Sequence, residues 1–150
     1  MIMNIFKPKR IGTGYLLRWH LIPRNRFFNI YLHKFIGDDD DRALHDHPWH
    51  SFSILLKGRL LEYHEATPMQ RFINGSYRNF PELRRFVPRF CYRSAISTHR
   101  LELLDKTKPA WTLFITGPHV REWGFHCSKG WQHWSTMTTE KGETIGGCDN

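Results

Sequence analysis

Three histidines carry the most specific chemical signal in this sequence of 150 residues. His45 and His47 lie two positions apart in the segment ALHDHPWH. In a β-strand, side chains at such positions point to the same face, so both imidazoles can bind one metal ion. Asp46 and His50 fall on the opposite face of the same strand, which makes Asp46 a poor ligand.

A third ligand has to come from a neighbouring strand, and His99 is the best candidate. It begins the segment HRLELL, in which Leu101 and Leu103 share its parity and are expected to face inward. Three imidazoles suit Fe, Zn, Cu, Ni or Mn and leave coordination positions open for water or substrate. We therefore predict that His45, His47 and His99 bind one divalent transition metal ion.

The spacing around these residues resembles the first motif of the cupin superfamily of small β-barrels. In that motif a His-x-His pair is followed after three or four residues by Glu, and after six more by Gly. Here the pair is His45 and His47, Ser51 stands in the position of the Glu, and Gly58 is in place. The family's second motif contributes a third His, which the resemblance assigns to His99.

The resemblance covers residues 28–134 and implies an all-β fold, the cupin double-stranded β-helix or jelly-roll barrel. The strings HDHPW, HRLEL, TLFITGP and WGF are similar to those of short single-domain cupins of bacteria and phages. Among cupins, three-His sites include dioxygenases that use non-heme iron. The resemblance therefore favours Fe as the metal, with Mn, Ni or Zn as alternatives.

Ser51 changes the expected charge of the site. Cupins usually bind their metal with three His and one Glu, so a site with Ser51 would be neutral and would leave the metal its two positive charges. That favours a small anionic molecule in the barrel. We expect Arg121 to pair with its acid group, and Ser51 and Trp49 to contact it as well. Glu62 is an alternative source of the missing carboxylate.

The segments around these residues read as strands. Each is about five to eight residues long, alternates or is rich in β-branched and aromatic residues, and is bounded by turn formers. In the first, Tyr15, Leu17, Trp19 and Leu21 alternate with Leu16, Arg18 and His20. The predicted strands lie within residues 12–23, 27–36, 51–56, 59–63, 99–104 and 111–116. A short helix is predicted over residues 81–86, and Trp49, Trp111, Trp123 and Phe125 are expected to line the interior.

Length and composition indicate a single domain over residues 1–137, followed by a polar, Gly-rich tail over residues 138–150 that is expected to be disordered. The charge of +8 is spread along the chain, and no nucleic-acid-binding motif accompanies it, so we expect a basic surface and no nucleic-acid partner. The acidic run Asp38–Asp41 is expected to be a solvated loop.

No apolar segment is long enough for a membrane span or a signal peptide, so the sequence predicts a cytoplasmic protein without a membrane partner. The cysteines Cys91, Cys127 and Cys148 are accordingly expected to be reduced. A homodimer is compatible with the sequence.

Three functions remain open at this point. The first is a metal-dependent cupin enzyme, such as a non-heme iron oxygenase that acts on a small anionic molecule. The second is a barrel that binds a metal ion or a small molecule without catalysis. The third, motivated by the charge of +8, is a prophage structural or nucleic-acid-associated protein.

Overall fold

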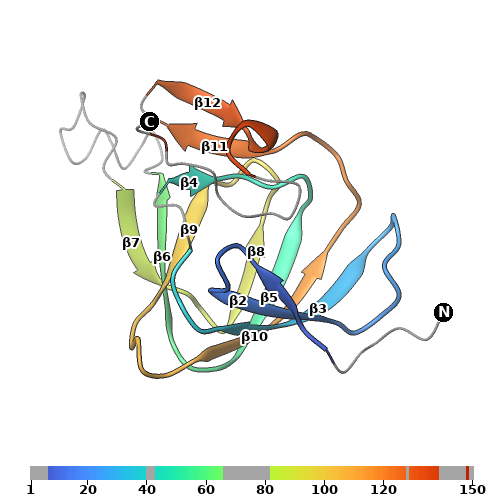
Figure 1. Cartoon of the computed structure of the whole chain (residues 1–150), viewed down its shortest axis with the longest axis vertical. Coiled ribbons are helices and arrows are strands. Elements are labelled where there is room, and N and C mark those ends of the chain that lie inside the picture. Colours follow the sequence, from blue (N-terminus) through green and yellow to red (C-terminus); the bar gives the residue numbers. More distant parts are fainter. Residues whose placement is uncertain (1–6, 40–42, 66–81, 128, 139–147, 149–150) are drawn as a thin grey trace.

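Two antiparallel six-stranded sheets curl around a shared interior (Figure 1). The computed structural model describes residues 7–39, 43–65, 82–127, 129–138 and 148. The first sheet has the order β1-β2-β3-β10-β5-β8. Its strands are β1 (Lys9–Ile11), β2 (Leu16–His20), β3 (Asn29–Phe35), β10 (Ala110–Thr116), β5 (Ser51–Lys57) and β8 (Phe90–Arg93).

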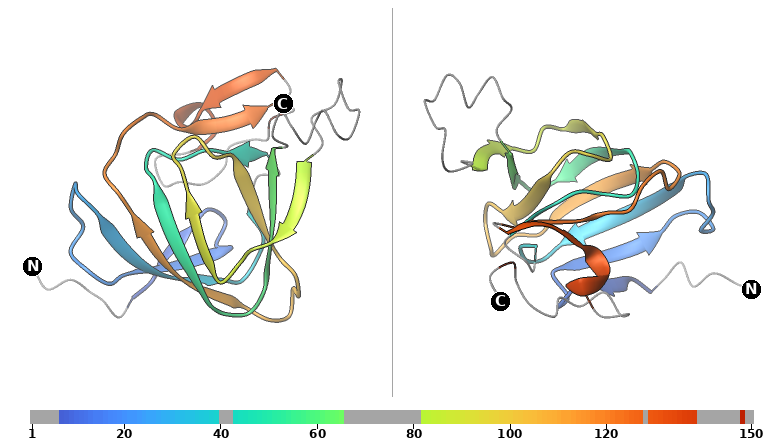
Figure 2. Two further views of the ribbon diagram at one scale, coloured as in Figure 1. Left: turned by 180° about the vertical axis from the view of Figure 1, so that it is seen from behind. Right: turned by 90° about the horizontal axis from the view of Figure 1, so that it is seen from above.

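The second sheet has the order β12-β11-β4-β9-β6-β7. Its strands are β12 (Gly130–His133), β11 (Gly124–Cys127), β4 (Leu44–His45), β9 (His99–Leu103), β6 (Leu60–Glu65) and β7 (Glu82–Phe86), and a 3₁₀-helix, η1 (Trp134–Thr136), follows β12. The views from behind and from above show the hairpin of β11 and β12 beyond β4, at the edge of this sheet (Figure 2). The all-β jelly-roll prediction is therefore confirmed.

The interior is apolar in one part and polar in another. Six side chains from both sheets and their connections form a buried apolar cluster: Leu16, Phe35, Leu60, Val87, Leu103 and Ala110. Elsewhere the inward-facing positions bury polar groups, among them His33 on β3, Glu62 on β6 and Arg93 on β8. Buried polar side chains need partners, so this polar part is where a functional site is expected.

The six predicted strand segments all contain strands, but the short helix predicted over residues 81–86 is wrong. Residues Glu82–Phe86 form β7, which pairs with β6 in the register Leu61↔Phe86 to Glu65↔Glu82. A partner strand supplies backbone hydrogen bonds that outweigh a weak local preference. Trp111 also departs from expectation, because it faces outward and stacks on Trp19 with ring centroids 5.7 Å apart.

The acidic run is only partly the solvated loop that we predicted. The Asp39 carboxylate accepts a hydrogen bond from the Leu101 amide at 2.7 Å, and that of Asp38 accepts one from the Leu103 amide at 2.8 Å. Asp38 also pairs with Lys106. These two carboxylates therefore satisfy the backbone of β9, while residues 40–42 lie outside the described residues.

The expectation of reduced thiols is wrong for two of the three cysteines. Cys127 at the end of β11 forms a disulfide with Cys148, and Cys91 is free and buried. The disulfide ties residue 148 to the second sheet. Most of the predicted disordered tail, residues 139–147 and 149–150, lies outside the described residues, and the division into a domain over residues 1–137 and a tail stays a prediction.

In the part of the chain that the structure describes, no helix has both the length and the apolar character that crossing a membrane requires.

Candidate metal centre

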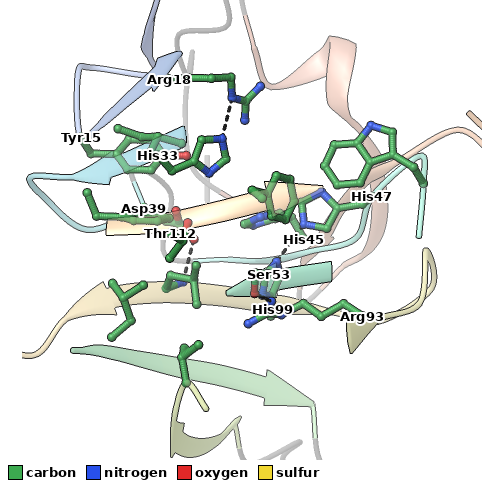
Figure 3. A pocket seen from close by; sticks show the side chains of 17 residues that line it. Tyr15, Arg18, His33, Asp39, His45, His47, Ser53, Arg93, His99 and Thr112 are labelled. Atoms are coloured by element: carbon green, nitrogen blue, oxygen red, sulfur yellow. Dashed lines mark hydrogen bonds between the residues drawn. The ribbon is translucent and has the colours of Figure 1, made fainter. Parts of the chain in front are cut away.

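The structure brings His45, His47 and His99 together. His45 on β4 is the register partner of His99 on β9, and His47 follows β4 two residues later. One ring nitrogen from each residue lies within 4.8 Å of the others. The Nε2 atoms of His47 and His99 are 2.8 Å apart, and Figure 3 shows the three rings gathered in the cavity.

Asp46 fixes the segment that carries two of these histidines. Its side chain points away from them and is 1% exposed. The carboxylate accepts hydrogen bonds from the Gly124 amide at 2.8 Å and from the Trp131 indole at 3.1 Å, and it contacts His126 at 2.9 Å and Arg121 at 3.0 Å. Burial alone would raise the pKa of Asp46, but these hydrogen bonds lower it to about 2. A charged, fully bonded carboxylate thus anchors β4 to β11.

Glu62 holds the third histidine from behind. The His99 Nδ1 atom lies 3.0 Å from the Glu62 carboxylate, so Nδ1 is the protonated nitrogen and Nε2 is left facing His47. The same carboxylate accepts hydrogen bonds from Arg93 Nε at 2.5 Å and from Arg85 Nε at 2.7 Å. A carboxylate that orients the outer nitrogen of a ligating His is a common feature of metal sites.

The electrostatics of the site keep His47 and His99 neutral. Burial lowers the pKa of His47 well below its ordinary value, and the neighbouring His99 and His45 lower it further. Burial lowers the pKa of His99 to about 3, although its hydrogen bond to Glu62 acts in the opposite direction. Neutral imidazoles are the form that binds metal ions. The donor set, the fixed Nε2 atom and the protonation state all fit a transition metal ion.

Of the three residues predicted to contact a substrate, only Trp49 lines the cavity. Trp49 lines the cavity and stacks on His47, with ring centroids 4.6 Å apart and an angle of 11°. Arg121 does not reach the cavity, because its guanidinium pairs with Asp46 and donates to the Ala95 carbonyl. Ser51 is buried outside the cavity lining, and its hydroxyl has no hydrogen-bond partner among the described residues. Glu62 faces the outer nitrogen of His99, so it takes the positioning role described above.

The cavity in front of the histidines has a volume of about 90 Å³, which is room for several water molecules or a small ligand. Polar side chains that line it, besides the histidines, include Arg18, His33, Asp39, Ser53, Arg93 and Thr112 (Figure 3). Arg18, His33 and Arg93 are not among the site residues predicted from the sequence. Arg18 shares the parity of the buried Leu16, and Arg93 that of the buried Cys91, but parity alone does not show which face of a strand is inside.

No protein-family model matches the sequence, and no curated protein is similar to it at a significant level. Solved structures match the fold at low sequence identity. The hydroxypropylphosphonic acid epoxidase from S. wedmorenis is 12% identical over 77% of this chain, with a TM-score of 0.53, and this chain spans only 58% of its length. Another structure of that epoxidase contains iron(II) and has a TM-score of 0.53.

Two further structures have the same architecture. A putative mannose-6-phosphate isomerase from Ralstonia eutropha is 14% identical and has a TM-score of 0.53; the match covers 77% of this chain and 95% of that one. Oxalate decarboxylase from Bacillus subtilis, which has manganese(II) centres, is 14% identical over 79% of this chain, with a TM-score of 0.52 over 29% of its own length. At this identity the likeness concerns the fold, and together with the topology described above it shows that this chain has the cupin fold.

Proposed function

We propose that this protein is a metal-dependent cupin in which His45, His47 and His99 bind one divalent transition metal ion. The observation that carries the proposal is the convergence of three imidazoles on one cavity, with the outer nitrogen of His99 held by a buried carboxylate. Iron is the metal that we favour, with manganese, nickel or zinc as alternatives. Iron(II) and manganese(II) in two of the matching structures support a divalent metal.

The proposed reaction class is oxygenation of a small anionic molecule. A bound ion would supply a Lewis acid and a template with open coordination positions. Around it, Trp49 and Phe114 form an apolar wall that excludes water, and Arg93 donates its Nη1 proton to the Ser53 hydroxyl at 3.1 Å. The phosphonate and oxalate in the names of two matching enzymes support an anionic substrate.

Metal analysis tests the binding step. The protein should be produced without a histidine tag, loaded with iron(II) under anaerobic conditions, and desalted. We expect a stoichiometric amount of iron in the wild type and in His50→Ala, since His50 is exposed and bonds to Tyr92 outside the cluster. His99→Ala should lose the metal. A wild type that retains no metal after separate loading with iron(II), manganese(II), nickel(II) and zinc(II) would disprove the proposal.

Oxygen consumption tests the reaction class. The iron-loaded protein is mixed with a panel of small carboxylic and phosphonic acids, and the oxygen concentration is followed with an electrode. Substrate-dependent consumption that is absent in His99→Ala supports an oxygenase. Tight metal binding without turnover of any acid would favour the non-catalytic barrel. The cytoplasmic location and the homodimer stay predictions, and the Cys127–Cys148 disulfide does not favour a reducing compartment.

A further inference from the structure

Arg18 is a cation that lines the interior cavity of the barrel. Its side chain lies on β2, is only partly exposed, and lines the same cavity as the three histidines. Nε donates a hydrogen bond to His33 Nε2 at 2.9 Å, and the guanidinium lies over the Tyr31 ring, 4.8 Å from its centroid. Among the described residues, no carboxylate pairs with it.

The other charged side chains of the cavity already have partners. Arg93, 5% exposed, forms its ion pair with Glu62, and the Asp39 carboxylate is bonded to the Leu101 amide. Burial lowers the pKa of Arg18, and the positive charge of Arg24 lowers it further. An unmatched guanidinium in a partly desolvated cavity is costly unless a ligand supplies the negative charge.

Arg18 belongs to a polar row across three neighbouring strands. In the register of the first sheet, Arg18 on β2 faces His33 on β3, and His33 faces Thr112 on β10. All three side chains line the cavity. Figure 3 shows Arg18 and His33 on one side of the cavity and His99 and Arg93 on the other. The row therefore faces the three-histidine site from the opposite sheet.

We propose that Arg18, supported by His33 and Thr112, binds the carboxylate of a short organic acid. Since Nε is occupied by His33, the two Nη groups are left, and their fork matches the two oxygens of a carboxylate. One unmatched positive charge also corresponds to one carboxylate charge. A phosphonate carries more charge than Arg18 alone offsets. The acid is short because the cavity has a volume of about 90 Å³.

The carboxylate end defines where the rest of the molecule lies. Arg18 and His99 belong to opposite sheets, so an acid held by Arg18 extends toward the three histidines. This second part rests on the proposed metal function, whereas binding of the carboxylate to Arg18 does not.

The test is calorimetric titration of metal-free protein with three probes of similar size: propionate, its neutral isostere propionamide, and methylphosphonate. Concentrations reach about 10 mM so that a Kd near 1 mM is measured. We expect propionate to bind and propionamide not to bind. Because a hydrogen-bonded charge is lost, Arg18→Met should weaken propionate binding by about 10- to 100-fold. Arg18→Lys keeps the positive charge but lacks the two parallel N–H groups, so its affinity for propionate should lie between those of the wild type and Arg18→Met.

Arg121→Gln is the matched control, because Arg121 lies outside the cavity and was the alternative partner for an acid group. Its propionate affinity should equal that of the wild type. Thermal unfolding checks that the variants fold, and Arg18→Met should be at least as stable as the wild type without ligand, since it removes an unmatched charge. Equal binding of propionate and propionamide, tighter binding of methylphosphonate, or unchanged affinity in Arg18→Met would each overturn the proposal.

The same titrations with zinc-loaded protein separate this inference from the proposed function. If the protein binds no metal but binds propionate through Arg18, the carboxylate site is supported and the proposed metal function is disproved. The hydroxyl oxygen at the far end of 3-hydroxypropionate can coordinate the metal. In the zinc-loaded protein this acid should therefore bind more tightly than propionate, and the two acids should bind alike without metal. Equal affinities in the loaded protein would disprove the orientation toward the histidines.

Discussion

Replacing Glu62 with Gln removes the negative charge behind His99 while keeping the size of the side chain. Glu62 is 1% exposed and contacts three donors, which are His99, Arg93 and Arg85. The neutral amide has one acceptor oxygen where the carboxylate has two, and its NH₂ group meets donors. We expect lower stability and weaker metal binding from this one change.

The size of the effect follows from the burial of the partners. The side chain of Arg93 is 5% exposed, so it is left as an unmatched buried charge, which costs about 3–5 kcal/mol of unfolding free energy. The side chain of Arg85 is 50% exposed, and its pair adds less than about 1 kcal/mol. Loss of the partner that orients His99 should weaken metal binding by about 10- to 100-fold.

Urea denaturation of metal-free protein measures the stability, and zinc titration against a chelator measures the affinity. Glu102→Gln is the matched control, because Glu102 pairs with Arg100 in a more exposed position on β9 and should cost less than about 1 kcal/mol. If Glu62→Gln changes neither quantity more than the control does, the positioning role is wrong. Reduced stability with unchanged zinc affinity would also refute it, since Glu62 would then support the barrel alone.

The pH dependence gives an independent check on the same carboxylate. Burial acts to raise the pKa of Glu62, but the His99 hydrogen bond and the Arg93 charge lower it far below its usual value of 4.5. The stability that Glu62 contributes is therefore fully present above pH 4.5 and is lost as the pH falls toward the lower pKa of the folded state. The difference between wild type and Glu62→Gln should narrow over that acidic range.

Three other changes test further parts of the structure. Asp46→Asn should lower the unfolding free energy by about 1–3 kcal/mol, against little change in the exposed control Glu122→Gln. Because its pKa is lowered from 3.8 to about 2, this contribution is present above pH 3.8 and declines below it, which acid denaturation measures. Gly58→Ala should cost about 1–3 kcal/mol in urea denaturation, since φ is +82° and the new Cβ would lie 2.7 Å from backbone atoms of Pro109 and Ala110. Reduction of the Cys127–Cys148 disulfide, which closes a loop of 21 residues, should lower stability by about 3 kcal/mol, and unchanged urea curves with and without dithiothreitol would contradict the bond.

The three histidines could be predicted from the sequence because their arrangement depends on local rules. Strand parity places His45 and His47 on one face, and His99 opens a strand whose inward positions are Leu101 and Leu103. The pairing of His45 with His99 is the one long-range fact that was needed, and the family resemblance supplied it. The fold class followed in the same way from many short alternating segments.

The roles of Glu62 and Arg18 could not be predicted in this way. Alternation separates Leu16 and Arg18 from Leu17 and Trp19, but it does not show which of the two faces is inside. The aromatic face looks like the core, yet Leu16 is the buried residue and Arg18 the one that lines the cavity. Glu62 meets donors 23 to 37 residues away, on three different strands. Arg121 follows β10 in a loop, where no periodicity fixes the direction of a side chain.

The cupin motif's carboxylate is absent at Ser51, and a different carboxylate, that of Glu62, lies close to the site instead. At the motif position, Ser51 on β5 is the register partner of Arg93 on β8, and each has a buried polar atom with no hydrogen-bond partner in the part of the chain that the structure describes. The negative charge comes instead from Glu62 on β6, behind His99, where Arg93 neutralises it. A metal ion bound by three imidazoles, which carry no negative charge, would therefore keep its charge, and Arg18 adds an unmatched charge across the cavity. Both ends of the cavity then attract a negative group. An acid that also carries an oxygen able to coordinate the metal therefore fits better than a neutral ligand.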